Sequence, residues 1–281
     1  MNKYYFGAHI TVQKGYKEAV DEILKYGGNA IQIFLTPPRS AQMKRKTDNE
    51  YINFAKYLKE KDCIAVVHSS YLINLARKWE PSSWWIQNLL QEIEVANKFN
   101  AYGIVVHFGK SLDLTLEESY NNMFTALLYI LNETINCNVP LYMEMTAGQG
   151  TETGIGISGV NRLFKKIDKI KNKKIRNRLG VCFDSCHAFA SGIDLRDTSH
   201  IKQFFKEFNR EIGLENLKLI HLNDSKVNLG ERKDRHENIG KGKIGIYGIN
   251  KIFKLAEKLK IPCILETPNF GYKTEIKKLK K

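Results

Sequence analysis

Residues 64–109 read IAVVHSSYLINLARKWEPSSWWIQNLLQEIEVANKFNAYGIVVHFG and contain one complete structural unit. The runs IAVVHSS (64–70) and YGIVVHFG (102–109) are short, apolar and β-branched, which is typical of buried strands. Between them, PSSWWIQNLLQEIEVANKF (81–99) has the length and apolar spacing of a helix, with Pro81 near its first turn. A strand, a helix and a second strand in this order predict a parallel pair of strands with a helical crossover.

The same alternation continues along the chain. The other candidate strands are YYFGAHI (4–10), AIQIFL (30–35), PLYMEM (140–145), LGVCFDSC (179–186), NLKLIHLND (216–224) and PCILETP (262–268). Further helices are expected at 48–61, with Asp48 as the cap, and at 197–213. Because eight strands alternate with helices and no linker interrupts them, we predict an α/β fold. The predicted architecture is a single-domain (β/α)8 TIM barrel over residues 1–281.

Composition restricts the class of protein. No 18-residue apolar run is present, and MNKYYFGAHI (1–10) has no secretory h-region, so we expect no membrane partner and a cytoplasmic or nuclear location. Five scattered cysteines without a C-x-x-C motif argue against a disulfide framework and against a site made of cysteines alone. We expect a monomer.

The net charge of +14 favours a polyanionic partner such as nucleic acid, although a Lys-rich genome would produce the same excess. The densest basic run, KKIDKIKNKKIRNR (165–178), should lie at the end of the barrel opposite the active site. Basic residues in the loops after the strands are better placed to bind phosphates: Arg39, Lys44, Arg45, Lys46, Arg77, Lys78, Lys110, Lys226, Arg232, Lys233, Arg235, Lys241 and Lys243.

Histidines and carboxylates gather where the predicted strands end or in the loops that follow. They are His68, His107, Glu144, Asp184, His187, His221, Asp234, His236 and Glu266. A single histidine at a strand end is more often a structural residue, and Glu266 alone could cap a turn. Together, however, four carboxylates in one barrel mouth would repel each other unless cations were bound. Five imidazoles and four carboxylates suit two or three zinc ions, with manganese or iron as substitutes, and a phosphodiester substrate.

Several longer blocks resemble one known family. HSSYLINLA (68–76), EMTAGQG (144–150), CFDSCHAFASGID (182–194), HLNDSK (221–226), DRHENIGKGKIG (234–245) and LETP (265–268) are similar to the endonuclease IV family of apurinic/apyrimidinic endonucleases. The resemblance implies three Zn2+ ions, held by His68, His107 and Glu144, by Glu144, Asp184, His221 and Glu266, and by His187, Asp234 and His236. Glu144 would bridge the first two ions and be the central catalytic residue.

The resemblance also implies the reaction. The family cuts double-stranded DNA 5′ to abasic sites and leaves a 3′-hydroxyl and a 5′-deoxyribose phosphate, with a metal-bridging hydroxide as nucleophile. Tyr71 and Leu72 match the loop that is inserted into the DNA, and Arg39 lies in the loop that supplies an inserted arginine. The chain departs from the family pattern in LTPPRSAQ (35–42), in HFG (107–109), and in Ser69, which removes the usual side-chain partner of His68.

Two other functions remain compatible with these features. A sugar isomerase or epimerase uses the same barrel, but typically with fewer ligands and without a reason for the basic charge. A DNA-binding protein without catalytic activity would have no need for nine intact ligands.

Overall fold

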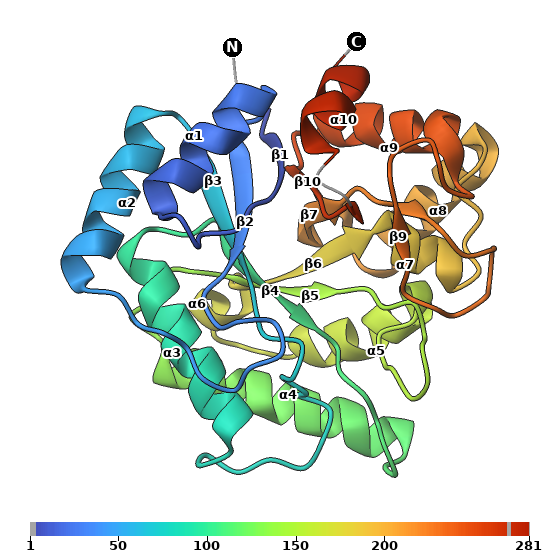
Figure 1. Ribbon diagram of the computed structural model, residues 1–281. Coiled ribbons are helices and arrows are strands. Elements are labelled where there is room, and N and C mark those ends of the chain that lie inside the picture. The colour runs from blue at the N-terminus through green and yellow to red at the C-terminus, as the bar shows by residue number, and fades with distance from the viewer. Residues whose placement is uncertain (1–3, 269–270, 281) are drawn as a thin grey trace.

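Eight parallel strands form a closed barrel in the computed structural model, which describes residues 4–268 and 271–280 (Figure 1). Each strand pairs with the next along the chain, and the last strand pairs with β1 to close the sheet. The barrel strands are β1 (Phe6–His9), β2 (Ala30–Phe34), β3 (Ile64–His68), β4 (Gly103–His107), β5 (Leu141–Glu144), β6 (Leu179–Asp184), β7 (Leu217–His221) and β10 (Cys263–Leu265). The predicted (β/α)8 barrel is therefore confirmed.

Helices surround the barrel and bury their apolar faces against it. They are α1 (Tyr16–Tyr26), α2 (Asp48–Glu60), α3 (Trp84–Lys98), α4 (Leu116–Glu133), α5 (Gly156–Ile167), α8 (Thr198–Glu211), α9 (Gly245–Leu259) and α10 (Tyr272–Leu279). Short elements complete the chain: α6 (Lys173–Arg176), α7 (Ser185–Ala190), η1 (Leu214–Asn216) and the antiparallel pair β8 (Asp224–Ser225) and β9 (His236–Glu237). Among the described residues, no helix has the length and apolar character needed to cross a membrane.

Several predicted boundaries were wrong by a few residues. Strand β6 ends at Asp184, because Ser185 and Cys186 already belong to α7. Helix α2 is capped by Thr47 rather than Asp48, in a capping box where the Thr47 hydroxyl accepts from the Glu50 N–H and the Glu50 carboxylate accepts from the Thr47 N–H. Helix α3 begins three residues after Pro81, behind the N-cap Ser83.

The barrel interior is filled by one side chain from each of seven strands, a set we call the interior layer. Its members are Ala30, Val66, Val105, Tyr142, Cys182, Leu219 and Ile264. Strand β1 contributes Gly7 at this level, where a β-carbon would lie 1.7 Å from the carbonyl oxygen of Ala30. The polar side chains described below pack directly above the interior layer, toward the carboxyl ends of the strands.

The basic run 165–178 lies between the end of α5 and the start of β6, at the amino-terminal end of that strand. Its last member, Arg178, is buried and donates hydrogen bonds to the carbonyl oxygens of Val139 and Thr134, just beyond helix α4. This arginine therefore satisfies buried backbone acceptors and is not part of a surface patch.

Candidate metal centre

Polar side chains line the barrel one level above the interior layer, a set we call the polar ring. Successive residues of a strand point to opposite faces, so the residue two positions after each member of the interior layer also points inward. The polar ring consists of the residues two positions after Gly7 and after each member of the interior layer. They are His9, Gln32, His68, His107, Glu144, Asp184, His221 and Glu266. Six of these eight are predicted ligands, which explains why the ligands come from the ends of separate strands.

Glu144 joins two groups of ligand atoms. Its Oε2 atom lies 3.2 Å from His68 Nε2 and 3.0 Å from His107 Nε2. Its Oε1 atom lies 2.7 Å from His221 Nδ1, which is also 3.1 Å from Glu266 Oε2 and 3.9 Å from Asp184 Oδ2. Within each group the ligand atoms lie within 4.8 Å of one another. The two carboxylate oxygens of Glu144 therefore face different groups, the arrangement that a bridging ligand requires.

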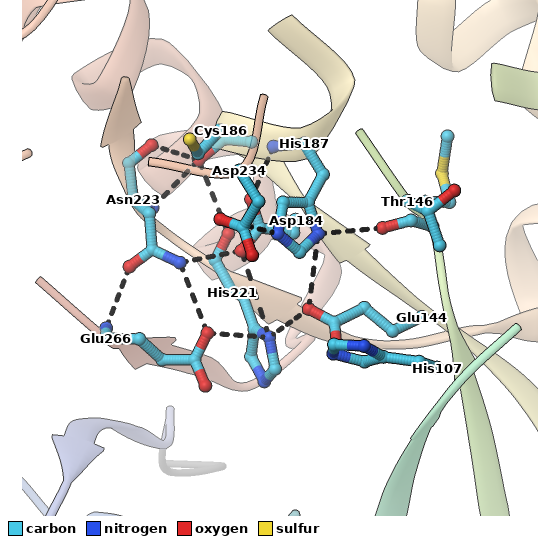
Figure 2. A network of polar contacts seen from close by, with 12 residues as sticks. His107, Glu144, Thr146, Asp184, Cys186, His187, His221, Asn223, Asp234 and Glu266 are labelled. Atoms are coloured by element: carbon cyan, nitrogen blue, oxygen red, sulfur yellow. Dashed lines mark hydrogen bonds and ion pairs between the residues drawn. The ribbon is translucent and has the colours of Figure 1, made fainter. Parts of the chain in front are cut away.

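A third group is formed by residues outside the barrel strands. His187 comes from α7, Asp234 precedes β9, and His236 is the first residue of β9. Asp234 Oδ1 lies 3.2 Å from His187 Nε2 and 3.3 Å from His236 Nε2. Figure 2 shows Asp234 and His187 beside Asp184, so that the third group adjoins the second. The structure thus brings all nine predicted ligands together in three groups.

Three of the histidines are oriented by backbone carbonyls. His68 Nδ1 is 2.8 Å from the Ser69 oxygen, His187 Nδ1 is 2.9 Å from the Met145 oxygen, and His236 Nδ1 is 3.2 Å from the Glu266 oxygen. A carbonyl can only accept, so in each ring Nδ1 carries a proton and Nε2 faces the group. The expectation that Ser69 leaves His68 without a partner was wrong, because the Ser69 backbone supplies the acceptor.

The short helix α7 explains the close spacing of Asp184 and His187. Asp184 is the N-cap of α7, and its Oδ1 accepts a hydrogen bond from the His187 N–H at 2.8 Å, while Oδ2 faces the second group. The neighbouring thiols of Cys182 and Cys186 are buried, and burial raises the pKa of each to about 12. Without a bound cation both stay protonated at neutral pH, although Cys182 and Cys186 each belong to one further group of possible ligand atoms.

Electrostatic attraction by neighbouring histidines holds Glu144 ionised. Burial alone would raise the pKa of Glu144, but His221 and His107 outweigh it and hold that pKa well below its usual value. Burial likewise lowers the pKa of His187, yet Asp184, Asp234 and Glu144 together raise it well above its usual value. Without cations, protonated imidazoles therefore balance the carboxylates, and a bound cation would take the place of those protons.

Two ring nitrogens are placed as metal ligands would be. The Nε2 atoms of His187 and His236 are buried and make no hydrogen bond with any described residue, although both lie beside Asp234. Buried imidazole nitrogens that face one carboxylate oxygen are the donor set that zinc and similar divalent ions use. The residues present thus fit a metal centre.

Sequence reasoning missed two buried amides beside the ligands. Asn223 Nδ2 donates to Asp184 Oδ2 at 2.7 Å, and Asn223 Oδ1 accepts from the Glu266 N–H at 2.8 Å. Gln32 belongs to the polar ring and contacts Glu266 and His221. Gln32 could have been found from AIQIFL, where a polar residue stands two positions after the inward-facing Ala30.

The predicted DNA-contacting residues lie at the barrel mouth. Arg39 and Tyr71 line the cavity above the groups, together with Lys110, Lys226 and Arg235. Tyr71 stacks on His107, with ring centroids 5.3 Å apart, and remains 49% exposed. Leu72 beside it is 45% exposed. An exposed aromatic and an exposed aliphatic side chain are thus adjacent at the mouth.

Comparison with known proteins identifies relatives that cover nearly the whole chain. The family model described as "Xylose isomerase-like TIM barrel" matches residues 20–281. The putative endonuclease 4 of Acanthamoeba polyphaga mimivirus is 35% identical over 272 residues, covering 93% of this chain and 85% of that protein. Endonuclease IV from Thermus thermophilus is 29% identical, with a TM-score of 0.82 over 98% of this chain and 97% of that one.

More distant structures share only the fold. A D-tagatose 3-epimerase-like protein matches with a TM-score of 0.70 at 18% identity, over 97% of this chain and 95% of that chain. That likeness concerns the barrel and carries no information on the reaction. The sequence relatives that match over more than nine-tenths of the chain include several proteins named endonuclease 4. The chain belongs to the endonuclease IV family.

Proposed function

We propose that this protein is a zinc-dependent DNA repair endonuclease that hydrolyses the phosphodiester 5′ to an abasic site in double-stranded DNA. The products would be a 3′-hydroxyl and a 5′-deoxyribose phosphate. The observation that carries the proposal is the three-group arrangement of nine ligands, with Glu144 divided between two groups. The names of the relatives, endonuclease 4 and endonuclease IV, point the same way.

In this proposal His68, His107 and Glu144 hold the first zinc ion, and Glu144, Asp184, His221 and Glu266 hold the second. His187, Asp234 and His236 hold the third. When bound, the three ions supply Lewis-acid polarisation of the phosphate and a hydroxide nucleophile at neutral pH. Glu144 keeps two groups at a fixed separation, so we assign it the central catalytic position.

The chain's other residues bind and orient the DNA. Lys110, Lys226 and Arg235 line the cavity and are suited to contact backbone phosphates on either side of the cleaved bond. Tyr71 and Leu72 are exposed at the mouth and would fill the space left when the abasic nucleotide leaves the base stack. Arg39 lines the same cavity and would contact the flipped nucleotide or its strand.

The test is incision of a labelled duplex that carries one abasic analogue. Zinc-loaded wild-type protein should cut it 5′ to the analogue and leave an end that a polymerase extends, whereas the undamaged duplex stays intact. Glu144→Ala should lose nearly all activity, because it removes a ligand from two groups at once. Glu117→Ala serves as the matched control, since Glu117 is an exposed residue of α4 that pairs with Lys166 on the outer surface.

Absence of incision by zinc-loaded wild-type protein would refute the proposal, and so would wild-type turnover by Glu144→Ala. Turnover of free ketoses or aldoses without incision would favour the sugar epimerase alternative.

A further inference from the structure

Gln32 is the amide of the polar ring and has no ligand role in the proposed centre. It stands on β2 with its side chain fully buried. Its Nε2 atom lies 2.6 Å from Glu266 Oε1 and 3.2 Å from His9 Nδ1, and its Oε1 atom lies 2.8 Å from His221 Nε2. One side chain therefore contacts two of the four residues in the second group.

Chemistry allows one orientation of this amide. A carboxylate that binds a metal ion can only accept a hydrogen bond, so the Gln32 atom that lies 2.6 Å from Glu266 Oε1 must be its NH2 group. If the amide were flipped, its carbonyl oxygen would face a carboxylate oxygen at that distance, and the two acceptors would repel. The Gln32 oxygen consequently faces His221, and the His221 Nε2 atom must donate to it.

This bond decides which nitrogen of His221 can bind a metal ion. With the proton held on Nε2, the lone pair of a neutral ring lies on Nδ1, which faces Glu144 and Glu266. Figure 2 shows His221 between these carboxylates, with its other ring nitrogen pointing away from them. His221 is thus reversed relative to His68, His187 and His236, which hold Nδ1–H on backbone carbonyls and present Nε2.

We propose that Gln32 is a positioning residue for the second metal group, which fixes the Nε2–H tautomer of His221 and holds Glu266 beside it. The proposal rests on the metal centre described above. The orienting partners of His68, His187 and His236 are backbone atoms, which a substitution leaves in place. The orienting partner of His221 is a side chain, so one substitution can remove the hydrogen bond that orients this ring.

The tautomer can be measured on the wild-type protein with zinc and no DNA. Long-range 1H–15N NMR of the zinc-loaded protein distinguishes a protonated Nε2 from a protonated Nδ1, and His221→Asn identifies the His221 signals. We expect His221 to be protonated at Nε2, opposite to His68, His187 and His236. Protonation of His221 at Nδ1 would overturn the proposal even if the protein cuts abasic DNA. The expected pattern would stand even if the protein cuts none.

Gln32→Met keeps the length of the side chain and removes its hydrogen bonds to Glu266, His221 and His9. We expect one bound zinc ion to become about 10–100-fold easier to remove by a competing chelator, and the His221 signals to shift while those of His68 stay in place. Ile33→Val is the control, because Ile33 is a buried neighbour on the same strand that belongs to the core around the helices. Unchanged zinc affinity in Gln32→Met, or an equal loss of zinc affinity in Ile33→Val, would contradict the proposal. If Gln32→Met does not fold, the tautomer of His221 in the wild-type spectrum tests the proposal.

Discussion

Glu92 is a fully buried carboxyl group outside the candidate metal centre. It lies on α3, and neither of its oxygens makes a hydrogen bond with a described residue. Burial raises the pKa of Glu92 to about 8, although nearby Thr36 offsets part of this effect. Because the pKa in the folded protein exceeds the usual value of 4.5, the folded state favours the protonated form.

Glu92 therefore makes stability depend on pH. Unfolding releases the Glu92 proton between about pH 4.5 and pH 8, so this contribution to stability is fully present below that window and is lost as the pH rises through it. Glu92→Gln resembles the neutral form and should stabilise the protein at pH 8 by on the order of 4 kcal/mol, with little effect at pH 4.5. Urea unfolding at the two pH values measures this. Glu94→Gln, an exposed change on the same helix, should show no such dependence, and an equal gain at both pH values would contradict the assignment.

At the scale of elements, the segment between β8 and α9 is anchored by one carboxylate. Asp224 is buried, and its two oxygens accept hydrogen bonds from the N–H groups of Gly240, Gly242, Ile244 and Gly245 at 2.9–3.2 Å. A β-carbon on Gly242 would lie 2.5 Å from Asp224 Oδ1, so the close approach requires glycine there. This segment carries Asp234 and His236, and Asp224 thereby helps to place two of the proposed ligands of the third group.

Asp224→Asn replaces one acceptor oxygen with an NH2 group and should leave at least one buried N–H without a partner. We expect a loss of about 1–3 kcal/mol in stability, faster hydrogen exchange at Gly240 and Gly242, and one zinc ion fewer. Asp197→Asn is the matched control, because Asp197 accepts from the N–H groups of Ser199 and His200 at the start of α8 on the outer surface. It should lose stability without losing zinc. A full zinc complement in Asp224→Asn would show that the segment is held by other contacts.

At the scale of the whole molecule, the excess positive charge is divided between the barrel mouth and the opposite end. Lys226 is exposed and lines the cavity above the metal groups, whereas Lys174 is exposed on α6, before β6 begins. Removing one lysine that binds a phosphate should lower the salt dependence of DNA binding by about one unit of slope in log Kd against log salt. Lys226→Ala should therefore reduce the slope on an undamaged duplex, and Lys174→Ala should not. If Lys174→Ala reduced the slope as much as Lys226→Ala, DNA would also contact the end of the barrel opposite the metal groups, which would contradict the prediction.

Most of the barrel and all nine proposed ligands could be predicted from the sequence, because strand ends such as IVVH and ILE carry residues with evident metal chemistry. The exact ends of elements could not. Asp184 ends β6 and at the same time caps α7, and both roles depend on the turn that the chain makes there. The acceptor for His68 also escaped prediction, because it is the backbone of Ser69 rather than its side chain. Gln32 and Asn223 were missed because an amide has no evident metal or acid–base chemistry by itself, and its role appears only with its neighbours in place.

We propose above all that nine side chains from six strand ends and two flanking segments hold three zinc ions. Crystals of the zinc-loaded protein, measured on both sides of the zinc absorption edge, test it most directly. We predict three anomalous peaks, one at His68, His107 and Glu144, one at Glu144, Asp184, His221 and Glu266, and one at His187, Asp234 and His236. Zinc bound elsewhere, or a single peak coordinated by only one group, would contradict the account.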